Sequence, residues 1–473
     1  MTCTAPAWES KYENVSFFIT MFYAMLFRMM KITNTVTGKR EIFKAQRPQK
    51  VTLYVCGVTP YDAAHIGHGR CYTAFDLLYR LLLFLDFEVV YCRNFTDIDD
   101  KLLNRAHKEL GDRLQYKKIA DRFIKQYHED MKALNCLSPK YEPRVTDHIP
   151  EIISFISGLI EAGHAYESDG DVYFDITSFS TYGKLSKHKL EDIFAGARVQ
   201  INEKKKNVLD FALWKSEPEG ECWQGPWGYG RPGWHIECSA LAAKYLGKTI
   251  DIHAGGLDLV FPHHENEIAQ SEALHKKTFA NYWMHNGLVR VNEEKMSKSL
   301  GNFFTLQDVF KQFDPIVVRY YLLQHHYRGP MDFSFDDIKG FEKSYRRLVR
   351  VFEQCDVFMQ IKKEELQQII LIQSMLACLK DDLNTSGMFG ILFENLDKIQ
   401  QDKKTLCAIK QFLQHVLGLT LEPLPEKMIK LTPEIEALIE ERKKTRAEKN
   451  WARADEIRDK LRELGVDVQD KKS

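Results

Sequence analysis

The chain has 473 residues, which is too long for one hydrophobic core and predicts about three domains. Its 44% apolar and 28% charged residues are typical of a soluble globular protein, and its formal net charge of zero excludes a strongly basic or acidic chain. Ten cysteines without a C-x-x-C pair argue against a disulfide scaffold and for a reducing compartment. We therefore expect a cytoplasmic protein.

The N-terminal part carries an apolar stretch, SFFITMFYAMLF, over residues 16–27. It is too short to span a membrane. No positively charged segment precedes it and no small-residue cleavage site follows it, so it does not have the pattern of a signal peptide. We expect residues 1–28 to be an extension outside the fold and predict no membrane contact. The alternative is a short apolar arm that packs on the surface.

The next part, residues 29–139, contains a strand–helix–strand pattern. KVTLYVCG (50–57) and FEVVYCRN (87–94) predict buried strands, and the apolar sequence between them predicts a helix. Such a βαβ unit forms a parallel sheet with a right-handed crossover. Its ligand site is expected at the carboxyl ends of the strands.

The pattern changes at residue 140. AYESDGDVYFDI has an Asp-Gly pair between alternating apolar residues, which predicts a β-hairpin, and we assign residues 140–225 to an insertion between two halves of one sheet. Strands and helices alternate again over 226–335. Helical apolar spacing then predicts an all-α bundle over 336–425 and a charged helix pair over 426–473. The predicted fold class is α/β with a C-terminal all-α region.

The second half of the sheet contains FPHHENEIAQ, residues 261–270. Proline favours the first turn of a helix, so a helix is expected to start at or near Pro262. On that helix His263 and Glu267 share a face, and a His-x-x-x-Glu pair suits zinc. The alternative is a solvated first turn that is rich in acids because of the helix dipole.

Two further motifs have residues suited to phosphate chemistry. His65-Ile66-Gly67-His68 follows the first strand, where a helix N-terminus attracts phosphate and two imidazoles can donate to phosphate oxygens. Lys295-Met296-Ser297-Lys298-Ser299 comes later and offers two lysines to a triphosphate. Each motif alone is equally consistent with an ordinary turn or a solvated loop.

Together and in this order, HIGH and KMSKS resemble the motifs of the class I aminoacyl-tRNA synthetases. The segments YVCGVTPYDAAHIGHGR, RNFTDIDDK, RPGWHIECSA, GGLDLVFPHHENE and NYWMHNGLV make the chain similar to the cysteinyl-tRNA synthetase family over roughly residues 29–465. The resemblance implies a Rossmann-type parallel sheet split by an inserted domain and followed by an all-α tRNA-binding region.

The resemblance also implies one zinc ion per chain. Carried over by position, its ligands are Cys56, Cys238, His263 and Glu267. The alternatives are that both cysteines are buried core residues, and that His264 and Glu265 are the ligands instead.

The resemblance further implies ATP-dependent ligation of L-cysteine to tRNA-Cys through cysteinyl-adenylate, with magnesium accompanying ATP. The implied catalytic residues are His65, His68, Lys295 and Lys298. The residues implied to bind ATP are Gly57, Thr59, His65, Gly67, His68, Asp258 and Lys298. Thr96 and Trp234 are the candidates for contact with the bound amino acid.

Basic residues of the C-terminal helices are candidate tRNA phosphate contacts: Arg346, Arg347, Arg350, Arg442, Lys443, Lys444 and Arg446. Solvated helix faces are the alternative for each of them. Two rival functions stay open at this point: a cysteine ligase acting on an amino-sugar acceptor, and a zinc-stabilised tRNA-binding protein without catalysis. We expect a monomer.

Because the family resemblance begins near Met29, we predict that a protein starting at Met30 keeps full activity and the same thermal midpoint. Thermal unfolding and aminoacylation assays of the two lengths test this. A drop of several degrees would instead mean that Phe17, Phe18, Phe22 and Leu26 fill a groove of the folded protein.

Overall fold

The computed structural model describes residues 29–188, 203–291, 293–296, 302–355, 360–425 and 433–463. The predicted N-terminal extension lies outside these residues. The described chain forms two compact units, one ending at Glu422 and one within residues 423–473. In the described part, no helix is long and apolar enough to cross a membrane.

The centre of the larger unit is a four-stranded parallel sheet with the strand order β11-β10-β3-β4. Its strands are β3 (Lys50–Val58), β4 (Glu88–Phe95), β10 (Ile250–Gly256) and β11 (Ala280–Asn286). Helix α2 (Ile66–Phe84) connects β3 to β4, and α8 (Glu265–His275) connects β10 to β11. The predicted βαβ unit is confirmed. The carboxyl ends of all four strands lie at one edge, where a ligand site is expected.

The insertion separates the two halves of this sheet in sequence. It contains an antiparallel sheet of β5 (Ala165–Ser168), β6 (Asp171–Phe174), β7 (Phe211–Ser216), β8 (Trp223–Gly225) and β9 (Gly228–Pro232). The predicted hairpin is β5–β6, and its two turn residues, Asp169 and Gly170, both have positive φ, which suits the Asp-Gly pair. The insertion extends beyond its predicted end at residue 225. Strand β9, which runs to Pro232, belongs to the same sheet, since it pairs with both β7 and β8.

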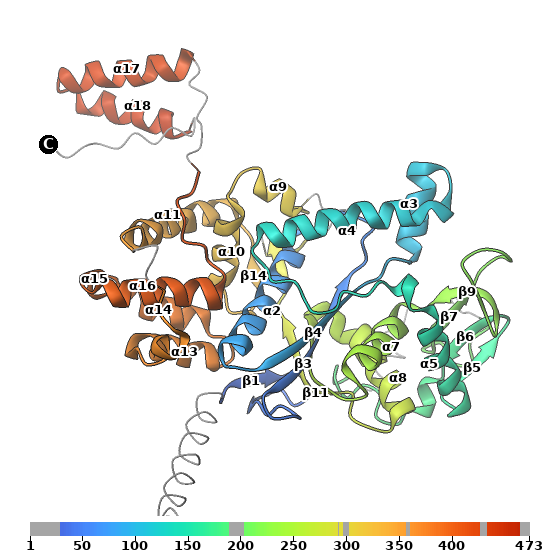
Figure 1. Ribbon diagram of the computed structural model, residues 1–473. Coiled ribbons are helices and arrows are strands. Elements are labelled where there is room, and N and C mark those ends of the chain that lie inside the picture. The colour runs from blue at the N-terminus through green and yellow to red at the C-terminus, as the bar shows by residue number, and fades with distance from the viewer. Residues whose placement is uncertain are drawn as a thin grey trace, which may run out of the picture. The chain divides into compact units, whose positions relative to one another are not determined.

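Helices make up nearly all of the described chain after β14 (Met331–Asp332). In the larger unit they are α11 (Phe335–Phe352), α12 (Lys363–Leu366), α13 (Ile370–Lys380), α14 (Thr385–Glu394), α15 (Leu396–Gln401) and α16 (Lys403–Phe412). Figure 1 shows the parallel strands between these helices, at the left, and the insertion, at the right. The smaller unit is a helix pair, α17 (Pro433–Ala447) and α18 (Trp451–Glu463), with Ile435, Ile457 and Leu461 buried between them.

The remaining elements complete the larger unit. Strands β1 (Lys31–Asn34) and β2 (Lys39–Ile42) form a hairpin, and β12 (Val289–Val291) pairs with both β13 (Glu294–Lys295) and β14. The other helices are α3 (Asp100–Leu110), α4 (Tyr116–Ala133), α5 (Ile149–Glu161), α7 (Trp234–Leu246), α9 (Leu306–Phe310) and α10 (Pro315–Gln324). One disulfide, between Cys355 and Cys407, lies in the helical region and was not predicted. Seven other cysteines among the described residues are free.

A buried ion-pair group joins helix α2 to the helical region. Arg319 of α10 is fully buried and pairs with Asp76 of α2 at 2.5 Å. Its remaining donors bond the backbone oxygens of Leu417 at 2.7 Å and of Leu134 at 2.9 Å. Arg80, one turn after Asp76 on α2, completes the group, with its Nε 2.8 Å from a carboxylate oxygen of Asp76. These charges are removed from water, so the two arginines rely on the carboxylate of Asp76 for their compensating charge.

We predict that Arg319→Met lowers the free energy of unfolding by about 1–3 kcal/mol, because the buried carbonyl oxygens of Leu417 and Leu134 lose their donor while Asp76 keeps its pair with Arg80. Urea unfolding of the larger unit, followed by circular dichroism, measures it. Arg347→Met, on the exposed face of α11, is the matched control and is expected to change stability little. Equal losses in the two variants would contradict the structural role of Arg319.

Candidate functional site

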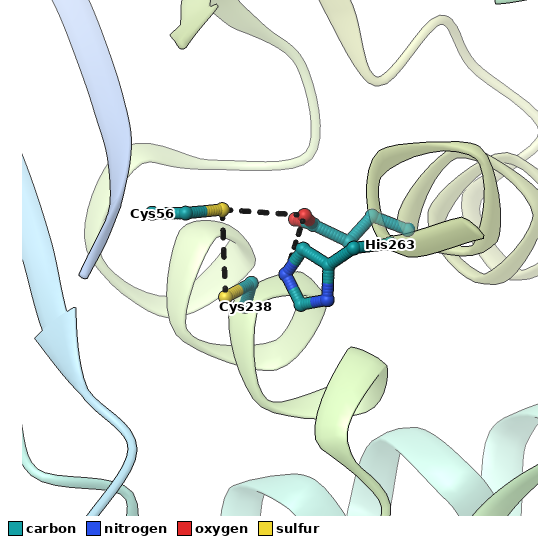
Figure 2. A group of neighbouring side chains, drawn as sticks. Cys56, Cys238 and His263 are labelled. Carbon is teal, nitrogen blue, oxygen red and sulfur yellow. Dashed lines mark hydrogen bonds and ion pairs between the residues drawn. The ribbon is translucent and has the colours of Figure 1, made fainter. Parts of the chain in front are cut away.

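Four potential metal ligands meet at the carboxyl edge of the parallel sheet (Figure 2). Cys56 lies near the end of β3, Cys238 is in α7, and His263 lies in the turn before α8. The fourth, Glu267, is in the first turn of α8. All four side chains are buried, at 0–5% exposure. The structure therefore brings together the four residues that the family resemblance implied.

The distances between these ligand atoms fit a tetrahedral zinc site. The two sulfurs are 3.9 Å apart, Cys56 Sγ lies 3.5 Å from Glu267 Oε1, and His263 Nε2 lies 3.2 Å from the same oxygen. Zinc–sulfur bonds of about 2.3 Å and zinc–nitrogen or zinc–oxygen bonds of about 2.0–2.2 Å give tetrahedral edges of about 3.8, 3.5 and 3.4 Å for these pairs. A set of two sulfurs, one imidazole and one carboxylate also suits zinc chemically.

The turn before α8 aligns two of the ligands. The regular α-helix begins at Glu265, after an irregular turn over Val260–His264 in which Phe261 is extended. The chain has helical conformation from Pro262 onward, so the predicted helix start at or near Pro262 is confirmed. His263 and Glu267 share a face, as predicted, because the chain between them is helical.

A second set of ligand atoms is also close enough for a metal. It keeps Cys56 and Glu267 and replaces the other two with His253 and His264. His253 Nε2 lies 2.8 Å from Glu267 Oε2, and His264 Nε2 lies 3.2 Å from Cys56 Sγ. In the first set these contacts instead orient the ligands from outside, since each imidazole hydrogen-bonds one ligand atom.

Glu265 is fully buried but belongs to neither set. Its carboxylate accepts backbone N–H groups of the insertion: Gly183 at 3.0 Å, Leu185 at 3.1 Å and Ser186 at 2.7 Å. The carboxylate is therefore committed to holding the insertion against α8. This removes the alternative in which His264 and Glu265 are the ligands.

Burial sets the protonation of the cluster. It lowers the pKa of His263 and His264 well below the ordinary value, so both imidazoles are neutral near pH 7, which is the form that binds metal. Burial also raises the pKa of the Cys56 thiol and of the Glu267 carboxyl. Burial therefore disfavours their ionised forms, and a divalent cation would supply the charge that stabilises them as anionic ligands.

The cluster adjoins a cavity of about 380 Å³. Many of the residues predicted to act on ATP or cysteine line it: Cys56, Gly57, Thr59, His65, Gly67, His68, Trp234 and Asp258. Trp234 is 41% exposed, and its ring lies 4.4 Å from that of His263. Thr96 is buried and does not line the cavity; its hydroxyl donates to Glu237 at 2.7 Å.

His65 and His68, which also line the cavity, form a reciprocal cap on α2. The Nδ1 of His65 accepts the backbone N–H of His68 at 3.3 Å, and the Nδ1 of His68 accepts that of His65 at 3.2 Å. Backbone nitrogen only donates, so in each ring the proton lies on Nε2. The rings stack at 3.7 Å. Each therefore offers a neutral Nε2–H donor beside the helix N-terminus, a combination that suits phosphate oxygens.

The KMSKS motif is only partly described. Lys295 ends β13, with its backbone alone described, and Lys298 lies outside the described residues. Met296 lines the cavity, which brings this segment to the site.

The candidate tRNA contacts differ in accessibility. Arg347 and Arg350 are exposed on α11, and Lys443 and Lys444 are exposed on α17. Arg346 and Arg446 are partly buried, and Arg346 pairs with Glu342 at 2.7 Å. Arg442 is only 6% exposed, so the prediction that its guanidinium faces a phosphate is wrong. Position 442 lies two helical turns after the buried Ile435 and so shares the face of α17 that packs in the helix pair. The four basic residues within 442–446 made this apolar period hard to recognise in the sequence.

Comparison with family models and known proteins supports the resemblance to the cysteinyl-tRNA synthetase family. Residues 42–343 match the family model described as the tRNA synthetases class I (C) catalytic domain, and residues 429–473 match the cysteinyl-tRNA ligase anticodon binding domain. A cysteine–tRNA ligase of Sulfurihydrogenibium is 45% identical, over 93% of this chain and 98% of that protein. One from Geobacillus is 46% identical, over 93% and 97%.

Solved structures show the same fold. The methionyl-tRNA synthetase of Mycobacterium tuberculosis, bound to methionyl-adenylate, has a TM-score of 0.57 and 14% identity, and covers 79% of this chain and 92% of that chain. The LeuRS of Agrobacterium radiobacter has a TM-score of 0.58 and 12% identity, over 80% and 85%.

We predict that His65 titrates far below an ordinary histidine. Burial lowers its pKa to about 4, so the neutral ring that caps α2 persists above that pH and is lost only as the pH falls through it. Ring proton shifts in an NMR titration measure the midpoint, with His65→Asn to assign the signal. A midpoint near the ordinary value of about 6.5 would contradict the buried, neutral cap.

Proposed function

Because the chain belongs to the cysteine–tRNA ligase family of class I aminoacyl-tRNA synthetases, we propose that it ligates L-cysteine to tRNA-Cys in two ATP-dependent steps. We further propose that Cys56, Cys238, His263 and Glu267 hold a zinc ion that selects cysteine. The observation that carries the proposal is the buried four-ligand cluster, which adjoins the same cavity as the His65–His68 cap.

In the first step a carboxylate oxygen of cysteine attacks the α-phosphorus of ATP, and the bond to the leaving pyrophosphate breaks. The Nε2–H groups of His65 and His68 donate to the phosphate oxygens at the N-terminus of α2. Both rings are neutral, so they contribute hydrogen bonds and not charge. Lys295 and Lys298 would neutralise the charge of the leaving pyrophosphate, and a magnesium ion bound with ATP would supply further positive charge. In the second step a hydroxyl of the terminal adenosine of tRNA attacks the carbonyl carbon, and AMP leaves.

The four-ligand cluster beside the cavity would select cysteine over serine. Serine is nearly isosteric with cysteine, and shape alone separates such pairs poorly. A bound zinc ion would supply a Lewis acid that prefers thiolate sulfur to hydroxyl oxygen. A discrimination of about 10⁴-fold corresponds to about 5.5 kcal/mol. Trp234, whose ring lies over His263, forms a wall beside this site.

The acceptor is tRNA and not an amino sugar. The match of residues 429–473 to an anticodon-binding domain supports this choice, since an amino-sugar acceptor has no use for such a domain. The exposed Arg347 and Arg350 of α11 and Lys443 and Lys444 of α17 are the phosphate contacts that we propose. The cytoplasmic location and the monomeric state stay predictions of the sequence.

Pyrophosphate exchange with cysteine and with serine, together with metal analysis, tests the proposal. We expect about one zinc ion per chain and exchange with cysteine but not serine. In Cys238→Ser we expect loss of zinc and a large rise in the KM for cysteine, because zinc binds a hydroxyl far less well than a thiolate. Cys92→Ser, a buried cysteine of β4 outside both ligand sets, is the control. Full zinc occupancy in Cys238→Ser would refute the ligand assignment.

A further inference from the structure

Asn94, at the end of β4, is a buried amide that the sequence did not single out; its side chain is 1% exposed. We infer that Asn94 is a positioning residue that fixes the two cysteine ligands relative to each other. The inference rests on the proposed zinc site, and it assigns a residue that is neither a ligand nor part of the cavity wall.

The oxygen of the Asn94 amide lies among three side-chain and backbone groups. It accepts the backbone N–H of Gly57 at 3.0 Å and the hydroxyl of Tyr54 at 3.1 Å, both from β3. The sulfur of Cys238, from α7, lies 3.7 Å from the same oxygen. This contact is a hydrogen bond only while the Cys238 sulfur is a thiol, because a zinc-bound thiolate has no proton to donate to an amide oxygen. In the zinc-bound protein, Asn94 is therefore fixed to the strand that carries Cys56 and reaches the helix that carries Cys238 through its Nδ2 group.

The orientation of this amide is fixed. A backbone N–H only donates, so the atom that faces Gly57 is the oxygen, and the Nδ2 group points to Thr96, whose hydroxyl lies 3.3 Å away. Thr96 in turn donates to the buried Glu237 at 2.7 Å. Glu237 directly precedes Cys238, so this chain of hydrogen bonds reaches the second cysteine by another route.

The backbone at this point permits no adjustment. A Cβ atom at Gly57 would lie 1.5 Å from the carbonyl oxygen of Asn94, so only glycine fits where β3 and β4 approach. Gly57 directly follows Cys56. Asn94 thus holds Gly57, the residue after Cys56, and Thr96, which is bonded to Asn94, holds Glu237, the residue before Cys238. Ligand distances in a metal site must be correct to about 0.2 Å, which makes such support necessary.

The substitutions Asn94→Ala and Asn94→Asp test this assignment. Alanine removes all four contacts, whereas aspartate keeps an oxygen for Gly57 and Tyr54 but loses the donor to Thr96. The control is Asn34→Ala in β1, since Asn34 is 3% exposed and bonds the backbone of Trp283 at 3.1 Å and of Asn281 at 3.0 Å, outside the cavity wall. It removes a comparable number of buried hydrogen bonds from another part of the same unit.

We expect zinc to leave Asn94→Ala roughly 10–100-fold faster than the wild type in the presence of a chromogenic chelator, the usual effect of losing an outer partner of a metal ligand. The KM for cysteine should rise while the KM for ATP stays unchanged, a difference that general destabilisation does not produce. Asn94→Asp should also release zinc faster than the wild type, and it decides the question if the alanine variant does not fold. Asn34→Ala should release zinc at the wild-type rate.

Two failures are distinguishable. A wild-type protein without zinc would overturn the proposed metal site itself. Wild-type protein that holds zinc, with Asn94 variants that release it no faster than Asn34→Ala, would overturn the role of Asn94 alone.

Discussion

Burial of anionic ligands away from water is the constraint on which the active-site half of this fold depends. Cys56 and Glu267 approach within 3.5 Å in the interior, and their ionised forms are costly there without a cation. The surroundings supply neutral imidazoles and an amide, and no buried lysine or arginine is among the described residues that contact these ligand atoms. The cluster therefore suits the divalent cation that we propose for it, and the sheet edge holds its ligand atoms in place.

The same sheet edge separates two tasks. In one part, the proposed zinc ligands (two sulfurs, an imidazole and a carboxylate) would distinguish the cysteine side chain from that of serine. In the other part, the N-terminus of α2 and two neutral imidazoles present donors to phosphate. The insertion contributes to the first part, because its backbone binds the buried carboxylate of Glu265, which lies between His263 and Glu267 in the chain. An insertion that is separate in sequence thus supports the proposed metal site.

Much of this could be predicted from the sequence because the relevant signals are local. Each of three local patterns predicts one feature of the structure: the Asp-Gly pair predicts the hairpin turn, the strand–helix–strand spacing predicts the parallel sheet, and the four-residue interval between His263 and Glu267 predicts a shared helix face. The supporting residues could not be predicted in this way. His253 and Asn94 lie within apolar strands, where period-two alternation does not distinguish a core position from a partner of a ligand. Their roles arise from contacts across 14 and 144 positions of the chain, to Glu267 and Cys238.

The buried group around Arg319 extends the same reasoning beyond the site. Its guanidinium binds Asp76 of α2 and the carbonyl oxygen of Leu417, the last residue of the turn Leu413–Leu417, while Arg80 reaches the backbone of Asn135 at 2.6 Å. Helix α2 carries the His65–His68 cap at its N-terminus, so the helix that presents donors to phosphate is anchored at mid-length to the helical region. Because the pair is shielded from water, its geometry is specific and costly to disturb. The helical region therefore fixes the position of the helix whose N-terminus carries the His65–His68 cap.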